Sequence, residues 1–286
     1  MQFWLIQTLN SVAFGGLLFL LAAGFSLIFG LLRIPNLAHG ALFMLGAYLG
    51  ATLLGLDWPL WAAALAVAIG VGAFGAVLER LLLRRLAGNE QGQVLVTLGI
   101  AFIIADFCLS TWGGDPMPLA SPASLSRPLR LFGYAFPTYR LVVLVVAVVA
   151  LVLLVLLLNY TRLGAMIRAG VDDRMMARGV GIRVGALFNT VFFLGAALAG
   201  FGGVVGGPIL SAYPGLDTDM LPLALIVVIL GGVGSLGGAL VGSFLIGFIY
   251  NFGNALLPDF AYVVLFLPMV LALVFKPEGL FGRAAP

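Results

Sequence analysis

Long apolar runs alternate with short polar linkers along most of this chain. The runs cover approximately residues 8–32, 38–56, 59–79, 93–112, 139–159, 184–210, 221–250 and 260–275. Stretches of 18 or more apolar residues can cross a hydrocarbon core of roughly 30 Å as helices. A membrane β-barrel would alternate apolar and polar positions, whereas LVVLVVAVVALVLLVLLL (141–158) is apolar throughout. The pattern predicts an all-α integral membrane protein of about eight transmembrane helices, in a single domain over residues 1–286.

Glycines interrupt two of these runs. Small residues recur at four-residue spacing in GAALAGFGGVVGGP (195–208) and in LGGVGSLGGALVGSFLIG (230–247). Such spacing lets helices pack closely, and we favour this interpretation for any single pair. The glycines of GGVGSLGG are too dense to lie on one packing face, so a broken or re-entrant helix is predicted there, and 221–250 is either one bent crossing or two short ones. The predicted break residues are Gly231, Gly232, Gly234, Gly237 and Gly238.

A polar segment, RIPNLAHG (33–40), separates two apolar runs. Pro35 is incompatible with unbroken helical hydrogen bonding, and Asn36 can cap the helix that follows. His39 is the single histidine of the chain. We favour a structural role for Asn36 and His39 over contact with a transported solute. Arg33 lies on the cytoplasmic side if 38–56 is a full span, or within the membrane if this segment is a break in a discontinuous helix.

Composition agrees with a membrane location. Hydrophobic residues make up 63% and charged residues 9%, and the mean hydropathy is +1.19. An ordinary soluble domain is about half apolar and about a quarter charged. The net charge of +3 belongs to the linkers, so nucleic acid is not implied as a partner.

The residues that catalysis needs are scarce. One cysteine and one histidine exclude an intramolecular disulfide and a multi-histidine metal site. The chain has no G-x-x-x-x-G-K-[ST] motif, and its single lysine is Lys276. No Ser/His/Asp spacing or recurring carboxylate pair lies in the spans. We therefore expect no enzyme activity, no resident metal or cofactor and no ATP hydrolysis by this chain alone.

The linkers predict an orientation. Residues 80–92 are basic, and residues 160–183 hold five arginines. The positive-inside rule places both in the cytoplasm, together with the C-terminus. The Pro/Gly/Ser-rich stretch 113–138 is then an external loop of irregular or amphipathic structure.

The 160–183 segment is the most informative linker. A continuous helix would place Asp173, Ala177 and Gly181 on one stripe, beside a flank of Arg168, Arg174 and Arg178. The small residues leave room for a partner to lie against the stripe. A solvated interfacial helix whose arginines meet anionic lipid headgroups explains the charges equally well.

Six short motifs, taken in order, resemble the permeases of branched-chain amino acid ABC importers. They are NLAHG (36–40), MLGAYL (44–49), T-R-x-G-x-x-I-R-A (161–169), ALAGFGGVVGGPI (197–209), LGGVGSLGGALVG (230–242) and FKPEGLFG (275–282). The chain resembles the shorter LIV-type permease subunit with Asn-Phe-Ala-His-Gly, with Leu37 in place of Phe. Residues 174, 175 and 179 depart from the family pattern.

The resemblance implies a function, a location and partners. It implies that residues 160–183 form a cytoplasmic coupling segment that docks into a cleft of an ATPase through Arg162, Gly164, Arg168, Asp173, Ala177 and Gly181. It implies a multi-pass protein of a bacterial or archaeal inner membrane, acting by alternating access on a small hydrophobic amino acid. The partners implied are a second permease, two ATPase subunits that bind ATP and Mg²⁺, a soluble substrate-binding protein and membrane lipid.

Asp106 is the one acid deep within a predicted span, and it departs from the family pattern. An ionisable group at such depth usually faces the bundle interior or a watery cavity. It pairs with an arginine near the external interface, binds the partner permease, or tunes the pathway for a substrate ammonium group. We rank external or inter-subunit pairing first.

Other functions remain open at this level. Importers of the same class for amides, urea or aromatic acids share the motifs. An ATP-independent secondary transporter or channel would show ion-coupling acids or a ring of charged residues at mid-membrane. Asp106 is one such acid, and it alone gives this alternative little support.

Overall fold

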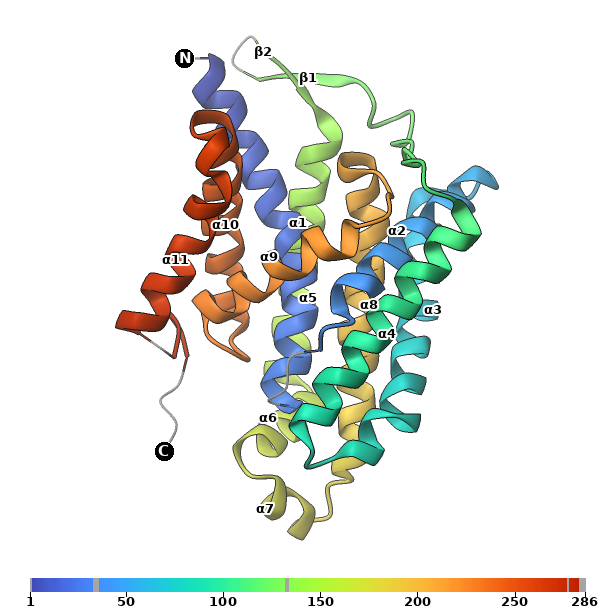
Figure 1. Cartoon of the computed structure of the whole chain (residues 1–286), viewed down its shortest axis with the longest axis vertical. Helices are drawn as coiled ribbons and strands as arrows, with labels where there is room; N and C mark the ends of the chain where they lie inside the picture. The colour runs from blue at the N-terminus through green and yellow to red at the C-terminus, as the bar shows by residue number, and fades with distance from the viewer. Residues whose placement is uncertain (1, 33–35, 132–133, 277, 283–286) are drawn as a thin grey trace.

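The chain folds as a bundle of helices with one small hairpin (Figure 1). The computed structural model describes residues 2–32, 36–131, 134–276 and 278–282. Its first half contains α1 (Gln2–Leu32), α2 (His39–Gly55), α3 (Leu60–Leu81), the 3-10 helix η1 (Leu83–Leu86), α4 (Glu90–Trp112), and the strands β1 (Pro128–Leu131) and β2 (Tyr134–Pro137). Its second half contains α5 (Thr138–Tyr160), α6 (Arg162–Asp172), α7 (Arg174–Gly179), α8 (Val184–Leu210), α9 (Leu216–Gly231), α10 (Leu236–Leu256), the 3-10 helix η2 (Pro258–Phe260) and α11 (Ala261–Phe275).

The bundle has two distinct ends. The β1–β2 hairpin and the start of α1 lie at one end, which we call the hairpin end, and α6 and α7 lie at the opposite end, the α7 end (Figure 1). Among the described residues, six helices are long and apolar enough to cross a membrane, namely α1, α3 with η1, α4, α5, α8 and α10, while α2 and α11 are shorter apolar helices. The predicted all-α membrane architecture is confirmed.

The centre of the bundle is α1, whose residues 13–28 are all buried. In contrast, α4 and α5 expose large apolar side chains such as Phe102, Ile103 and Leu153. Exposed apolar surface of this extent marks a membrane or a partner.

Helices α2 and α8 cross at a close backbone contact. A Cβ added to Gly46 would lie 2.6 Å from Gly200 Cα, closer than real Cβ contacts permit. On the α8 side, a Cβ added to Gly203 would overlap the carbonyl of Phe43, so Gly46 and Gly203 permit this crossing, as the small-residue spacing predicts.

Helix α2 begins inside the bundle. Its first residue, His39, places Nε2 3.0 Å from the carbonyl oxygen of Leu21, which belongs to the middle of α1. The α1 helix continues for 11 further residues to Leu32, or roughly 16 Å at 1.5 Å per residue. Of the two alternatives, this geometry favours a polar break within the bundle for the described residues 36–40. Arg33 and Pro35 lie outside the described residues.

The predicted break in 221–250 is present. Helix α9 ends at Gly231 and α10 starts at Leu236. Gly232 and Gly234 adopt φ values of +99° and +76°, a region that residues with a Cβ rarely enter. The stretch therefore forms two helices joined at these glycines.

The 113–138 linker is partly ordered. Its strands pair antiparallel from Pro128 with Pro137 to Leu131 with Tyr134. An isolated bridge joins Met117 to Ala212 and so fastens the linker to the α8–α9 junction. The irregular structure expected for this loop is found between α4 and β1, whereas the hairpin was not predicted.

Candidate functional site

The coupling segment, residues 160–183, starts with a turn that folds α6 back against the end of α5. Thr161 Oγ1 accepts the N–H of Gly164 at 3.1 Å, and the Arg168 guanidinium donates to the Leu158 carbonyl. A Cβ on Gly164 would overlap that same carbonyl. Gly164 and Arg168 therefore fix the direction of α6, while Arg162 is exposed at its start.

Asp173 divides the segment into two helices. Its Oδ1 accepts the N–H groups of Met175 and Met176 at 2.8 and 2.9 Å, and its backbone is extended at φ −147°. Aspartate is a favourable N-cap and a weak helix former, because its side chain competes for backbone N–H groups. The predicted continuous helix with a stripe of Asp173, Ala177 and Gly181 is therefore wrong. Gly181 lies beyond α7 at φ +86°.

The short α7 helix exposes apolar side chains at the extreme end of the bundle. Met175, Met176 and Val180 are 81%, 68% and 71% exposed, whereas Ala177 is 3% exposed. We call Met175, Met176 and Val180 the α7 tip. Residue spacing in the sequence indicates Ala177 and Gly181 instead of the tip. The sequence feature that could have indicated the tip is the presence of these three apolar residues within a charged linker.

A polar cluster ties α8 to α3 beside the coupling segment. Glu79 is 2% exposed, and its Oε2 accepts Asn189 Nδ2 at 2.8 Å and Arg84 Nη2 at 3.4 Å. The Arg84 guanidinium also donates to the carbonyl of Gly185, the second residue of α8. We call Glu79, Arg84, Asn189 and Gly185 the Glu79 clamp. In the sequence, Arg84 is one of the basic residues of 80–92 that indicate orientation, and no local pattern points to Glu79.

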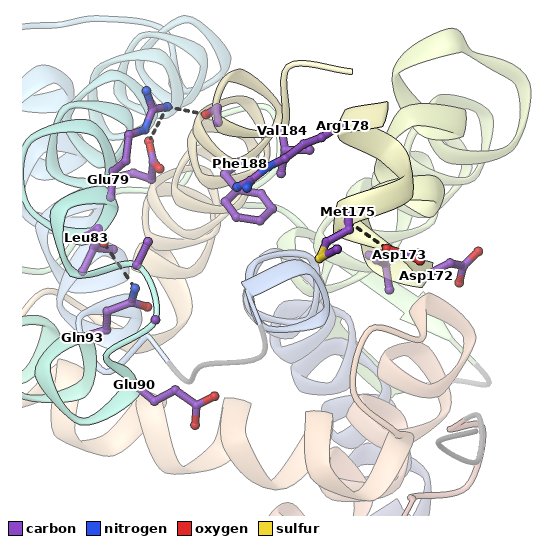
Figure 2. Close-up of a pocket in the computed structure, with 15 residues that line it drawn as sticks. Glu79, Leu83, Glu90, Gln93, Asp172, Asp173, Met175, Arg178, Val184 and Phe188 are labelled. Atoms are coloured by element: carbon purple, nitrogen blue, oxygen red, sulfur yellow. Dashed lines mark hydrogen bonds and ion pairs between the residues drawn. The ribbon is translucent and has the colours of Figure 1, made fainter. Parts of the chain in front are cut away.

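A cavity of about 570 Å³ opens between these two features (Figure 2). One wall is the corner formed by the end of α3, η1 and the start of α4, and the other is formed by α6, α7 and the start of α8. Gln93 Nε2 donates to the carbonyls of Leu83 and Leu86 at 3.3 and 2.9 Å. These hydrogen bonds join the start of α4 to η1 and stabilise the corner. In Figure 2 the Arg178 side chain extends from α7 toward Phe188 of α8.

Asn36 and His39 are buried at the start of α2. Asn36 Oδ1 accepts the N–H of Ala38 at 3.2 Å, and the His39 ring meets Phe25 edge to face at 5.3 Å. The predicted helix cap is wrong, because the N-cap of α2 is Ala38, without a side-chain hydrogen bond, and Asn36 closes the turn before it. His39 bonds to a neighbouring helix, and both contacts fit a structural role. Asn36 Nδ2 and His39 Nδ1 have no hydrogen-bond partner among the described residues.

The five glycines of the helix break differ in their surroundings. A Cβ on Gly231 would overlap the carbonyl of Gly238, and a Cβ on Gly238 would overlap that of Gly231, so these two bring α9 and α10 together. Gly232 and Gly234 form the turn described above, and Gly237 has open space around it. Residues after α11 cover this turn, since Leu280 N and Phe281 N donate to the carbonyls of Leu230 and Gly231 at 2.8 and 3.0 Å.

Asp106 lies on the outer face of α4. It is exposed and flanked by the exposed side chains of Phe102, Ile103 and Phe107. Within the described part of the chain its carboxylate makes no hydrogen bond or ion pair. The general expectation that such an acid faces the bundle interior does not hold for this chain on its own.

A family model described as "Branched-chain amino acid transport system / permease component" matches residues 7–273. The chain is 28% identical over 298 residues to the high-affinity branched-chain amino acid transport system permease protein LivH of Escherichia coli (strain K12), covering 98% of this chain and 96% of that protein. It is 29% identical over 297 residues to the corresponding protein BraD of Pseudomonas aeruginosa, with 98% and 96% coverage.

An archaeal protein is similar to the same extent. The probable branched-chain amino acid transport permease protein LivH of Methanocaldococcus jannaschii is 28% identical over 295 residues, covering 96% of this chain and 91% of that protein. No solved structure gives a significant match to the chain.

Proposed function

The chain belongs to the family of branched-chain amino acid transport permeases, and we propose that it is the permease subunit of an ATP-driven importer for leucine, isoleucine and valine. It forms half of the translocation pathway with a second permease. Two ATPase subunits bind ATP and Mg²⁺, and a soluble binding protein delivers the substrate. Residues 1–286 act as one transmembrane permease domain.

The observation that carries the ATPase assignment is the α7 tip. The six-residue helix exposes Met175 and Met176 by 81% and 68%, and exposed apolar side chains that lie together mark a contact surface. Methionine side chains adapt to the surface that they meet. We assign the tip as the contact with the ATPase. Asp173 caps the helix that presents it, and buried Ala177 seats that helix on the bundle.

The remaining predicted coupling residues act through the shape of this segment. Gly164 and Arg168 fix the α5–α6 turn, and Gly181 allows the chain to turn from α7 into α8. Arg162, exposed beside the turn, is available to the ATPase or to lipid headgroups.

The Glu79 clamp transmits the movement. Arg84 reaches the carbonyl of Gly185, so the first turn of α8 and the end of α3 are joined where the coupling segment enters the bundle. A displacement of α7 by the ATPase then moves α8 and α3 together.

Charge supports the orientation. Arg80, Arg84, Arg85 and the arginines of 160–183 gather at the α7 end, so this end is cytoplasmic by the positive-inside rule. The hairpin end with 113–138 is external and faces the binding protein. Because α1 starts at the hairpin end, its start is external too (Figure 1).

Asp106 serves the contact with the second permease. An exposed carboxylate among lipid-facing aromatic and aliphatic side chains is costly in hydrocarbon. Pairing with an arginine or an amide of the partner permease removes this cost. This agrees with the ranking that placed inter-subunit or external pairing ahead of substrate contact.

Reconstitution tests the function. The chain is co-expressed with the permease, ATPases and binding protein encoded beside it, and the complex is placed in liposomes. We expect uptake of labelled leucine, isoleucine or valine that requires the binding protein and ATP on the α7 side. Uptake that proceeds at the same rate without ATP would favour a channel or secondary transporter and would overturn the proposal.

A further inference from the structure

We propose that the cavity between the α3–α4 corner and α7 binds a free amino acid with a small apolar side chain on the release side of the membrane. The inference rests on the proposed function, because it takes the α7 end as the side where substrate is released. It adds a second site for the substrate class, one that senses product.

The charged residues that line the cavity can meet both charges of a zwitterion. They are the acids Glu79, Glu90, Asp172 and Asp173 and the arginines Arg84 and Arg178. Within it, Glu79 and Arg84 are engaged with each other. Glu90 and Arg178 also line the cavity, and no described hydrogen bond or ion pair occupies the Glu90 carboxylate or the Arg178 guanidinium. A guanidinium recognises a carboxylate through paired N–H donors, and a carboxylate accepts from an ammonium group.

Asp173 contributes a further acceptor on the α7 side. Its Oδ1 is used by the N–H groups of Met175 and Met176. The second oxygen of an ionised carboxylate remains able to accept a hydrogen bond. Glu90 lies on the opposite side of the cavity from Asp173 and Met175 (Figure 2), so a ligand between them meets charged groups from both walls.

Apolar side chains complete the cavity. Leu83 comes from the corner, Val171 from α6, and Val184 and Phe188 from α8. Small-molecule sites typically enclose about 300–1,000 Å³, with mostly apolar walls and a few placed polar groups. The volume of about 570 Å³ and the mixture of apolar and charged lining residues suit a small aliphatic amino acid.

In the proposed mechanism the ATPase displaces the α7 part of the second wall relative to the corner, while the Glu79 clamp keeps α8 with α3. Gln93 fixes the corner, whereas Arg178 and Asp173 belong to the coupling segment. A ligand that bridges them stabilises the arrangement in which they are close. Because the ligand binds this arrangement more tightly, it raises the free energy needed for any ATP-driven step that separates them. Amino acid accumulated on the release side is therefore expected to slow ATP turnover.

The binding test uses the full-length chain in lipid nanodiscs without partners. Equilibrium binding of leucine is compared with leucine methyl ester, which lacks the carboxylate, and with 4-methylpentanoate, which lacks the ammonium group. We expect each analogue to bind at least 10-fold more weakly than leucine. If either analogue bound as tightly as leucine, the site would not recognise both charges of the amino acid, and the inference would be wrong whatever the variants show.

Variants place the binding in this cavity. Arg178→Gln and Glu90→Gln are expected to weaken leucine binding at least 10-fold. Arg85→Gln, an exposed arginine of the same corner that does not line the cavity, is the matched control and is expected to bind as the parent does. Binding that survives both cavity variants would assign leucine to another site and overturn the inference.

The regulatory role is tested in the reconstituted complex. Each variant's ATP turnover with leucine on the α7 side is divided by its own turnover without it, and we expect this ratio to fall at least threefold for the parent and to stay near one for Arg178→Gln. If leucine binds the isolated chain but not the complex, the ATPase occupies the cavity and the regulatory role is wrong. ATP-driven uptake without any leucine binding to the chain would refute this inference and leave the proposed function intact.

Discussion

Asn189 of α8 donates a hydrogen bond from Nδ2 to Glu79 Oε2 of α3 across 2.8 Å, at a carboxylate that is 2% exposed. The same Nδ2 reaches the Ala76 carbonyl at 2.6 Å. A buried carboxylate is stable only when paired and hydrogen-bonded. The pair therefore locks α3 to the helix that follows the coupling segment.

Replacing Asn189 tests the cost of opening this lock. Asn189→Ala leaves Glu79 with Arg84 at 3.4 Å as its described partner. An unsatisfied buried acceptor costs about 1–3 kcal/mol, and more when it is charged. We expect a lower thermal unfolding temperature in detergent. Asn254→Ala is the control, since that exposed side chain bonds only within its own helix among the described contacts. Equal unfolding temperatures for the two variants would contradict a structural role for the lock.

The α7 tip predicts a second effect. Met176→Asp places a charge where an apolar contact with the ATPase is proposed, so co-purification of the ATPase is expected to fall at least 10-fold, as measured by pull-down. Met166→Asp on α6, at 36% exposure, is the control outside the tip. Unchanged recovery of the ATPase with the tip variant would remove the tip from the interface.

The α2–α8 crossing predicts a packing effect. Gly46→Ala brings a Cβ to 2.6 Å from Gly200 Cα, so the helices must separate and lose their contacts. We expect a lower yield of monodisperse protein and a lower unfolding temperature. Gly70→Ala in α3 has nothing within 4 Å of the added Cβ. Since alanine favours helix by about 1 kcal/mol over glycine, this control is expected to be neutral or stabilising.

The helix break predicts a conformational effect. Gly232→Ala forces a residue with a Cβ to φ +99° and into the segment around Glu278 and Gly282. Residues in unfavourable backbone regions cost about 1–3 kcal/mol. We expect faster proteolysis near the C-terminal side of α11 than in the parent. Gly237→Ala meets open space and is expected to digest like the parent.

Asp106 predicts a difference between the isolated chain and the assembly. Asp106→Asn removes a charge that has no described partner within the chain, so the unfolding temperature of the isolated chain should not fall. The yield of the complex with the second permease is expected to fall, as measured by size-exclusion chromatography. A stable, fully assembled Asp106→Asn complex with normal uptake would contradict the inter-subunit assignment.

Much of the fold follows from patterns that depend on neighbours in sequence. The run at 141–158 predicts α5 because length and apolarity alone decide whether a helix can span a membrane. The break at Gly231–Gly238 was predictable because the residue type determines which backbone conformations are accessible.

The candidate site was harder to predict, because Asp173 can either continue a helix or cap a new one. Spacing suggested one helix through Asp173, but the capping hydrogen bonds of its carboxylate end α6 and start α7. Because α7 is a separate helix, Ala177 faces inward while Met175 and Met176 face outward. A periodicity that assumes one continuous helix gives the wrong face. The pairing of Glu79 with Asn189 joins residues 110 positions apart, and no local pattern reports such a contact.

The accessibility of position 176 tests directly whether the α7 tip is cytoplasmic and contacts the ATPase. A chain with Cys108→Ala and Met176→Cys is labelled with a membrane-impermeant maleimide in right-side-out and inside-out vesicles, with and without the ATPase subunits. We expect labelling only in inside-out vesicles, and protection there when the ATPase is bound. Labelling from the outer side, or labelling that bound ATPase leaves unchanged, would contradict this expectation.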